Sequence, residues 1–215
     1  MKKPDCMVFV IDDDLLVRDS IVDLLGSANL PVQAFGSTAE FMGHERPGVP
    51  ACLILDVQLP GLNGLDFQSE LKKADIELPI IFVTGHGDIP TSVRAMKAGA
   101  LEFLTKPFRG PELISAVRDA LEQDRTGLKR RSAVLELRDR LASLTPREHQ
   151  VMLLVVTGLL NKQIAGELGT TELTIKAHRA KVMRKMRAPS LADLVRMAEM
   201  LRLFHAPASS STKGE

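Results

Sequence analysis

The first 123 residues contain two hydrophobic patterns that alternate along the chain. Short apolar runs, each bounded by polar or turn-forming residues, are typical of strands buried on both faces of a sheet. They occupy residues 7–11, 31–35, 53–56, 79–83 and 101–104. Apolar residues at helical spacing follow each run, over residues 15–25, 37–42, 64–74, 90–98 and 111–122. This alternation predicts an α/β domain whose five-stranded parallel sheet has helices on both faces.

Residues 143–205 differ, because only helical patterns occur there. The expected helices cover residues 146–158, 161–169, 172–186 and 190–203. Thr145 and Glu148 form a capping-box sequence at the first of them. The second and third lie on either side of Gly169, and the third is rich in Lys and Arg. Two such helices around a glycine turn predict a helix-turn-helix unit in a small all-α domain.

The segment between these regions carries an apolar stripe. Leu121, Leu128, Leu135 and Ala142 recur every seven residues, which fits an amphipathic helical linker that continues the last helix of the first domain. Gly127 costs such a helix about 1 kcal/mol, so a hinge there is an equal alternative. The pattern leaves open whether the stripe pairs with a second subunit or packs on its own domains.

Charge supports a division into two domains. Residues 1–125 contain 12 Lys and Arg against 19 Asp and Glu, whereas residues 126–215 contain 16 against 8. An acidic half followed by a basic half indicates two domains with different partners. We expect a first domain over 5–123, a linker over 124–142, a second domain over 143–205 and a disordered, Ser-rich tail over 206–215.

Composition excludes several other classes of protein. No apolar run approaches the roughly 18 residues of a membrane span, and the N-terminus lacks the apolar core of a signal peptide. Cys6 and Cys52 do not make a disulfide framework. There is no phosphate-binding Gly-Lys loop and no nucleophile elbow. We therefore expect a cytoplasmic protein without a membrane partner.

The strongest chemical signal lies where the apolar runs of the first domain end. Asp12 and Asp13 follow the first run, and Asp56 ends the third. Carboxyl ends of parallel strands share one edge of a sheet, where ligands bind. Carboxylates gathered there would be costly without a cation, and their oxygens suit Mg²⁺.

Two more polar groups belong to the same edge. Thr84 ends the fourth run, and Lys106 follows the fifth. An amine and a hydroxyl can hold the oxygens of an anion, and together with a metal they suit phosphoryl transfer, which depends on positioning and charge neutralisation. Asp56, at the centre, can itself be the nucleophile and form an aspartyl phosphate.

Four motifs in this region resemble those of the receiver domains of two-component response regulators, over about residues 5–123. They are Val10-Ile11-Asp12-Asp13-Asp14, Leu55-Asp56-Val57-Gln58-Leu59-Pro60-Gly61, Val83-Thr84-Gly85 and Phe103-Leu104-Thr105-Lys106-Pro107-Phe108. The resemblance implies a flavodoxin-like fold in which Asp56 accepts a phosphoryl group from a sensor histidine kinase. It also implies that Asp13, Asp56 and the backbone carbonyl of Gln58 ligate Mg²⁺, with Asp12 acting through water or at the rim.

The resemblance assigns the remaining groups as well. Lys106 would bind the phosphate, with a cis peptide bond to Pro107. Thr84 and Phe103 would be the switch pair that responds to phosphorylation. Such a receiver assists only its own phosphoryl transfer and dephosphorylation, so the chain would not otherwise be an enzyme.

Residues 141–205 resemble the LuxR-type DNA-binding domain. The resemblance rests on Leu144-Thr145-Pro146-Arg147-Glu148, Asn161-Lys162-Gln163-Ile164-Ala165-Gly166-Glu167-Leu168-Gly169 and Thr174-Ile175-Lys176-Ala177-His178-Arg179. The resemblance implies that DNA is bound by Lys176, Ala177 and Arg179 in the major groove, and by Lys162, Thr171 and Thr174 near phosphates. Ala180 departs from relatives that have a longer polar residue at this base-facing place.

The two domains in this order resemble FixJ-type response regulators. In the implied mechanism, phosphorylation of Asp56 places a charge of roughly −1.5 to −2 beside Lys106 and Thr84. Thr84 then moves inward, Phe103 follows, and the face around residues 91–104 dimerises. A homodimer would place two DNA-binding units on a two-fold operator, with RNA polymerase as a further partner.

Two rival hypotheses remain open. An α/β phosphatase or phosphotransferase can also use an aspartate nucleophile, but it would normally have a second acid two residues later, where this chain has Gln58. A regulator that has lost phosphorylation could bind DNA constitutively. The intact set Asp56, Thr84 and Lys106 argues against that hypothesis, and the variant Asp56→Asn would test it.

Overall fold

The computed structural model describes residues 4–85 and 89–203, which belong to two compact units, residues 1–129 and 130–215. The tail expected over residues 206–215 lies outside the described residues. The first unit contains a five-stranded parallel sheet in the order β2-β1-β3-β4-β5. The strands are β1 (Met7–Ile11), β2 (Val32–Phe35), β3 (Ala51–Asp56), β4 (Ile80–Thr84) and β5 (Glu102–Thr105). This sheet confirms the predicted fold class and has the flavodoxin-like strand order.

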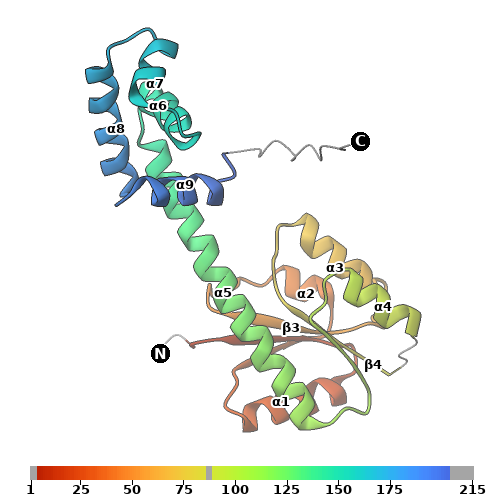
Figure 1. The fold of residues 1–215 in the computed structure, drawn as a ribbon. Helices are drawn as coiled ribbons and strands as arrows, with labels where there is room; N and C mark the ends of the chain where they lie inside the picture. Colours follow the sequence, from red (N-terminus) through yellow and green to blue (C-terminus); the bar gives the residue numbers. More distant parts are fainter. Residues whose placement is uncertain (1–3, 86–88, 204–215) are drawn as a thin grey trace, which may run out of the picture. The chain divides into compact units, whose positions relative to one another are not determined.

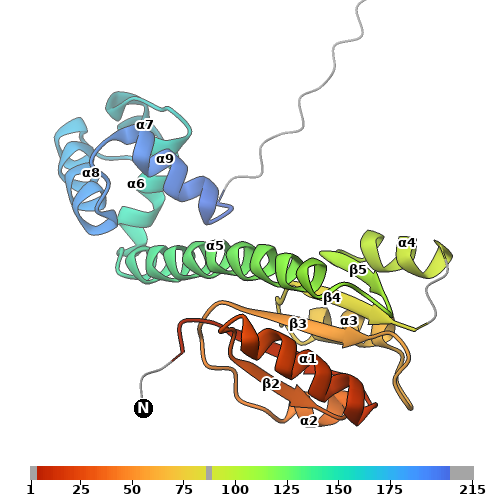
Figure 2. The same cartoon turned by 90° about the horizontal axis from the view of Figure 1, so that it is seen from below.

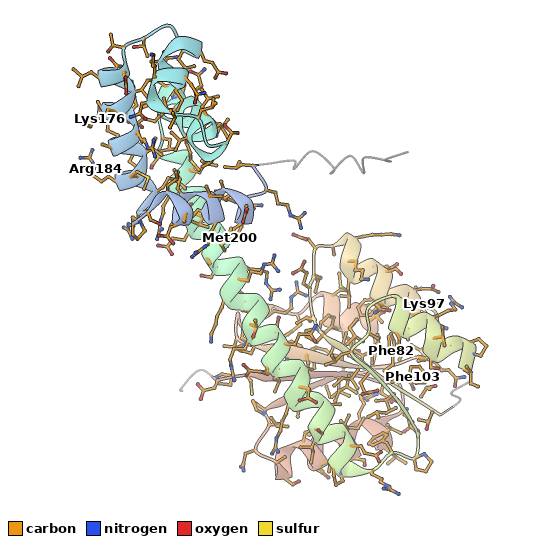
Figure 3. All side chains as sticks on the ribbon, viewed as in Figure 1. Phe82, Lys97, Phe103, Lys176, Arg184 and Met200 are labelled. Carbon is orange, nitrogen blue, oxygen red and sulfur yellow. The ribbon has the colours of Figure 1, made fainter. Side chains whose placement is uncertain are left out.

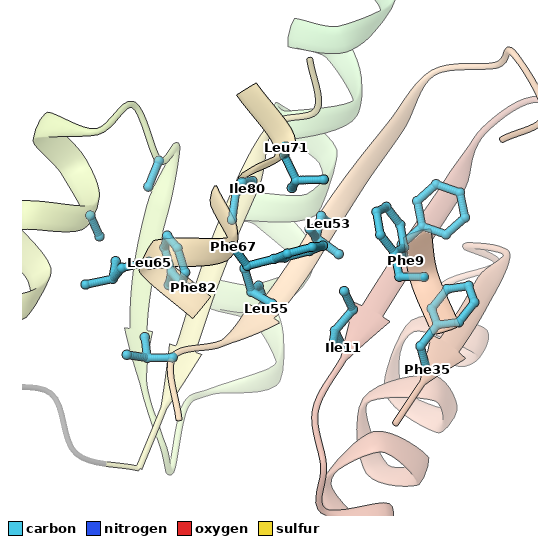
Figure 4. Packing of buried hydrophobic residues seen from close by; sticks show 14 of the residues in the cluster. Phe9, Ile11, Phe35, Leu53, Leu55, Leu65, Phe67, Leu71, Ile80 and Phe82 are labelled. Atoms are coloured by element: carbon cyan, nitrogen blue, oxygen red, sulfur yellow. The ribbon is translucent and has the colours of Figure 1, made fainter. Parts of the chain in front are cut away.

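Helices cover both faces of the sheet, and each face has its own apolar core (Figures 1 and 2). The helices are α1 (Leu15–Ser27), α2 (Thr38–Met42), α3 (Gly64–Lys73), α4 (Ile89–Lys97) and α5 (Gly110–Ala142). Helices α2, α3 and α4 contribute to one core, and α1 and α5 to the other. Figure 4 shows Phe67 of α3 lying over Leu53 and Leu55 of β3 in the first core. Buried strands flanked on both sides explain why the apolar runs show no alternation.

Local signals in the sequence fix where the helices begin. Asp14 caps α1 by accepting hydrogen bonds from the backbone N–H groups of Leu16 and Val17. Ser37 caps α2 in the same manner. Such caps satisfy backbone donors that a helix start would otherwise leave unpaired. They confirm the expected starts of both helices and set the positions of the loops at the carboxyl edge of the sheet.

Helix α5 is longer than a receiver helix ending near residue 122 would be. It runs without a break through Gly127 to Ala142. The linker is therefore helical, and the helix does not bend at Gly127. The apolar stripe is divided along its length. Leu121 packs in a core of the first unit and Leu137 in the core of the second, while Leu135 is 59% exposed.

The second unit packs four short helices and the end of α5 around one core. The helices are α6 (Pro146–Val156), α7 (Asn161–Glu167), α8 (Glu172–Met186) and α9 (Leu191–Met200). Thr145 and Glu148 make the predicted capping box at α6. Gly169 adopts a positive φ of 61° between α7 and α8, a conformation that glycine accepts at little cost. The two helices around this turn confirm the helix-turn-helix pattern.

None of the helices in the described part of the chain combines the length and apolar character needed to cross a membrane.

Candidate functional site

A buried carboxylate lies at the carboxyl edge of the sheet. Asp56, the last residue of β3, is 7% exposed. Its Oδ2 lies 3.0 Å from Nζ of Lys106, which follows β5. The same amine lies 2.6 Å from Oδ2 of Asp12, just after β1. Three strand ends that are distant in sequence therefore meet at one lysine, as the parallel topology predicts.

Asp13 completes an acidic cluster. The ligand oxygens of Asp12, Asp13 and Asp56 lie within 4.8 Å of one another. Asp12 is 2% exposed, whereas Asp13 is open to solvent. Three carboxylates against one ammonium leave a formal excess of two negative charges. An all-oxygen donor set with this excess suits a divalent cation such as Mg²⁺.

The contacts within the cluster affect its protonation. Burial raises the pKa of the Asp12 carboxyl, an effect that the hydrogen bond from Lys106 opposes. Burial also disfavours the charged form of Lys106, but its hydrogen bonds to Asp12 and Asp56 outweigh this and raise the pKa of the amine. Lys106 is therefore held as a cation at the point where an anion would bind.

A glycine and an arginine contact the backbone at the carboxyl ends of β3 and β1. Gly64, the first residue of α3, packs so closely on the Asp56 backbone carbonyl that a Cβ could not fit there. Nη1 of Arg18 donates a 2.6 Å hydrogen bond to the backbone carbonyl of Asp12. The sequence reasoning missed both residues. The only sequence signal for Arg18 was its place in the first turns of α1, which does not indicate a partner.

The expected switch residues lie on one face of the sheet near this cluster. Thr84 ends β4 and is fully buried, and its backbone carbonyl accepts a 2.7 Å hydrogen bond from the Lys106 N–H. Phe103 on β5 pairs in register with Phe82, and the centroids of the two rings are 6.3 Å apart. Both residues are labelled in Figure 3. Thr84 is two residues from Phe82, so its side chain belongs to the same face. The peptide bond between Lys106 and Pro107 is cis, as the resemblance implied.

The second unit presents α8 with one buried and one exposed face. Ile175, Val182 and Met186 are buried in the core. Lys176 and Ala177 are exposed, as is Lys162 on α7. Figure 3 shows Lys176 and Arg184 extending from α8 on the side away from α6 and α7. An exposed, basic second helix of this kind is the element that enters the major groove in helix-turn-helix proteins.

Both domains match the models of known families. Residues 8–118 match the family model of the response regulator receiver domain. Residues 142–198 match the model of bacterial regulatory proteins of the luxR family. This chain is a response regulator.

Three similar proteins extend along almost the whole chain. Nodulation protein W of Bradyrhizobium diazoefficiens is 54% identical over 195 residues, which cover 91% of this chain and 86% of that protein. The structure of response regulator StyR is 44% identical, with a TM-score of 0.78, and covers 91% of this chain and 99% of that one. Full-length FixJ from B. japonicum is 39% identical, with a TM-score of 0.54, and covers 92% and 98%. The order of domains in this response regulator is thus that of its FixJ-type relatives.

The structure places the residues expected at DNA in different surroundings. Thr171 caps α8 by accepting a hydrogen bond from the N–H of Thr174, and the two hydroxyl oxygens lie 2.8 Å apart. Arg179 is half-buried, and its Nη1 donates a 3.1 Å hydrogen bond to Oδ1 of Asn161 at the start of α7. Arg179 therefore links the two helices of the helix-turn-helix unit, a contact that the helical pattern alone did not indicate.

Proposed function

We propose that this response regulator is controlled by phosphorylation of Asp56 by a sensor histidine kinase. The observation that carries the proposal is the contact between Asp56 Oδ2 and Lys106 Nζ at 3.0 Å. The amine is in place to neutralise charge on a phosphoryl group attached to the carboxylate. Asp56 is the nucleophile: one of its carboxylate oxygens takes the phosphoryl group, and the histidine of the kinase is the leaving group. Hydrolysis of the aspartyl phosphate by water then restores the free carboxylate and releases inorganic phosphate.

The acidic cluster is proposed as a Mg²⁺ site. Asp13, Asp56 and the backbone carbonyl of Gln58 are the direct ligands, and Asp12 acts through water or at the rim. The all-oxygen donor set and its excess negative charge support this assignment. When bound, Mg²⁺ supplies charge neutralisation on the phosphoryl oxygens. Lys106 orients the phosphoryl group by holding one of its oxygens.

The proposed output is a change of population between inactive and dimeric states. The Thr84 hydroxyl donates a hydrogen bond to a phosphoryl oxygen, and Phe103 moves into the space that the Thr84 side chain leaves. The change reaches α4, where Val93 is 43% and Met96 45% exposed. Apolar side chains left open to solvent on one helix support a dimer through the face of residues 91–104.

The dimer binds operator DNA with its two helix-turn-helix units. Lys176, Ala177 and Arg179 are proposed for the major groove, and Lys162, Thr171 and Thr174 for the phosphates. The exposure of Lys176, Ala177 and Lys162 supports this division. Two units related by a two-fold axis match a pseudo-palindromic site, and RNA polymerase is the proposed partner of the bound dimer.

Phosphorylation is tested by intact-protein mass spectrometry after incubation with Mg²⁺ and acetyl phosphate, a small-molecule phosphoryl donor. We expect the mass to increase by one phosphoryl group in the wild type and not in Asp56→Asn. Asp23→Asn removes an exposed carboxylate of α1 and is the matched control that keeps the label. Equal labelling of Asp56→Asn and the wild type would overturn the assignment of the phosphoacceptor.

A further inference from the structure

The outward face of α8 carries a stripe that is mainly apolar. Leu173, Ala177, Ala180 and Arg184 are all exposed. Their spacing of four, three and four residues places them on one side of a helix. The residues buried in the core, Ile175, Val182 and Met186, define the opposite side. Three of the four positions in the centre of the exposed face therefore carry no hydrogen-bonding side chain.

Leu173 is the largest apolar group of this stripe. It is 78% exposed and lies in the first turn of α8. In helix-turn-helix proteins the N-terminal residues of the second helix contact base edges. The side chain therefore lies where sequence is read, although it can neither donate nor accept a hydrogen bond. A single exposed leucine is common on protein surfaces, so its chemical surroundings decide what covers it.

The surface around Leu173 is basic, and the side chains beside it along the stripe are short. Lys176 and Lys181 are exposed, and helical spacing places them on either flank of the stripe. Arg184 continues the stripe toward the helix end (Figure 3). Cations on both flanks match the two phosphate backbones that border a groove. Ala177 and Ala180 are too small to hold the helix away from the bases. The charge and the shape of this face thus fit the major groove of DNA.

The major groove offers one apolar group to such a stripe. Among the four bases, only thymine presents a methyl group there, and alanine, threonine and phenylalanine are known to contact it. We propose that Leu173, together with Ala177 and Ala180, reads thymine methyl groups in the operator. This inference rests on the proposed DNA-binding function and adds the chemical class of the bases that are read. It also gives a reason for Ala180, where a longer polar side chain would cover the stripe.

Replacement of thymine by deoxyuridine tests the proposal, because it removes only the methyl group. A binding site is first obtained by selecting duplexes from a random pool with the full-length protein, Mg²⁺ and beryllofluoride, a mimic of the phosphoryl group. Each thymine of the selected duplex is then replaced singly, and the Kd is measured by fluorescence anisotropy. We expect one or two positions per half-site to weaken binding about four-fold, the factor that corresponds to burial of one methyl-sized group.

Variants of Leu173 assign that effect to a side chain. Leu173→Ala should bind the thymine duplex more weakly than the wild type does. In this variant, replacement of thymine by deoxyuridine should cause no further loss of affinity, because the leucine and the methyl group contact each other. Leu173→Met keeps an apolar side chain and should keep the penalty. Leu135→Ala removes another exposed leucine, which lies on α5, and should leave the deoxyuridine profile unchanged. Circular dichroism verifies that each variant retains its helices.

The outcomes separate this inference from the function on which it rests. If no duplex is selected, or if Lys176→Ala leaves the affinity unchanged, the proposed DNA contacts of α8 are wrong. If wild-type protein binds its selected duplex and deoxyuridine has no effect at any position, DNA binding stands and the thymine reading is overturned. A penalty that persists in full in Leu173→Ala would also overturn the role of this side chain.

Discussion

At the scale of single residues, Glu148 shows how one carboxylate can join several parts of the DNA-binding unit. It is 3% exposed and completes the capping box of α6. Its Oε2 lies 2.6 Å from Nζ of Lys185 on α8, and the same amine donates to the backbone carbonyl of Ser143. A nearly buried charge is tolerated here because it has a charged partner and further hydrogen bonds.

This arrangement predicts how acid affects the unit. The hydrogen bond from Lys185, then that from the Thr145 N–H, lowers the pKa of Glu148 from 4.5 to about 2. A group with a depressed folded-state pKa stabilises the fold above its unfolded value and loses this contribution as pH falls through the folded value. We therefore expect the stability advantage of the wild type over Glu148→Gln to shrink between pH 4.5 and about 2.

The measurement is urea unfolding of both proteins at a series of pH values, followed by circular dichroism. Glu199→Gln, at an exposed position of α9, is the matched control and should differ little from the wild type. A stability difference between wild type and Glu148→Gln that stays constant over this range would contradict the prediction.

At the scale of elements, α5 is tied into both units by different kinds of contact. In the first unit, the buried Asp124 accepts a 2.9 Å hydrogen bond from the Ala51 N–H at the start of β3. In the second, Leu137 enters the core and Nη1 of Arg140 donates to the backbone carbonyl of Met186. The buried contacts explain why this 33-residue helix persists beyond the receiver, since tertiary packing stabilises helices more than propensity does.

The continuity of α5 leads to a prediction at Gly127. Because this glycine lies inside a helix, Gly127→Ala should raise the stability of the helix by about 1 kcal/mol. Thermal unfolding followed by circular dichroism measures the change. Gly158→Ala provides the contrast, since Gly158 has a φ of 90° that alanine adopts only with strain, and it should destabilise. A loss of helicity in Gly127→Ala would indicate instead that the chain bends there in solution.

At the scale of the whole molecule, the proposed switch converts a local charge into assembly. Moving a two-state equilibrium from mostly inactive to mostly active needs roughly 5 kcal/mol of differential stabilisation. The cluster around Asp56 and the exposed residues of α4 are the two ends of this coupling. Neither the acidic cluster nor the apolar face alone accounts for regulation, because the phosphoryl group must favour one state over the other.

Sedimentation of the full-length protein tests this coupling. With Mg²⁺ and beryllofluoride we expect a shift from monomer to dimer that is absent in Asp56→Asn. Val93→Glu places a charge on the exposed face of α4 and should weaken the dimer without loss of the phosphoryl label. Met42→Glu changes a similarly exposed residue on α2 and should leave the dimer intact. If the wild type does not shift at any attainable concentration, receiver dimerisation has no part in the mechanism.

The sequence by itself determined the fold class, the two-domain organisation and the residues around Asp56. Uninterrupted apolar runs such as residues 53–55 occur in parallel strands that are covered on both faces. Parallel strands bring their carboxyl ends to one edge, so Asp12, Asp56 and Lys106 could be grouped before any distance was known. Capping residues such as Thr145 were also readable, because their hydrogen bonds reach only two or three residues along the chain.

The tertiary structure alone decided the contacts between residues that are distant in sequence. Nothing local distinguishes Asp124 from a solvated helix acid, yet it is buried on Ala51. Arg179 belongs to the basic helix by its pattern, but its guanidinium group binds Asn161. Helical periodicity gives the direction of a side chain relative to its own helix axis. Its partner depends on how the elements pack, and this is why exposure of the Leu173 stripe emerged only from the folded chain.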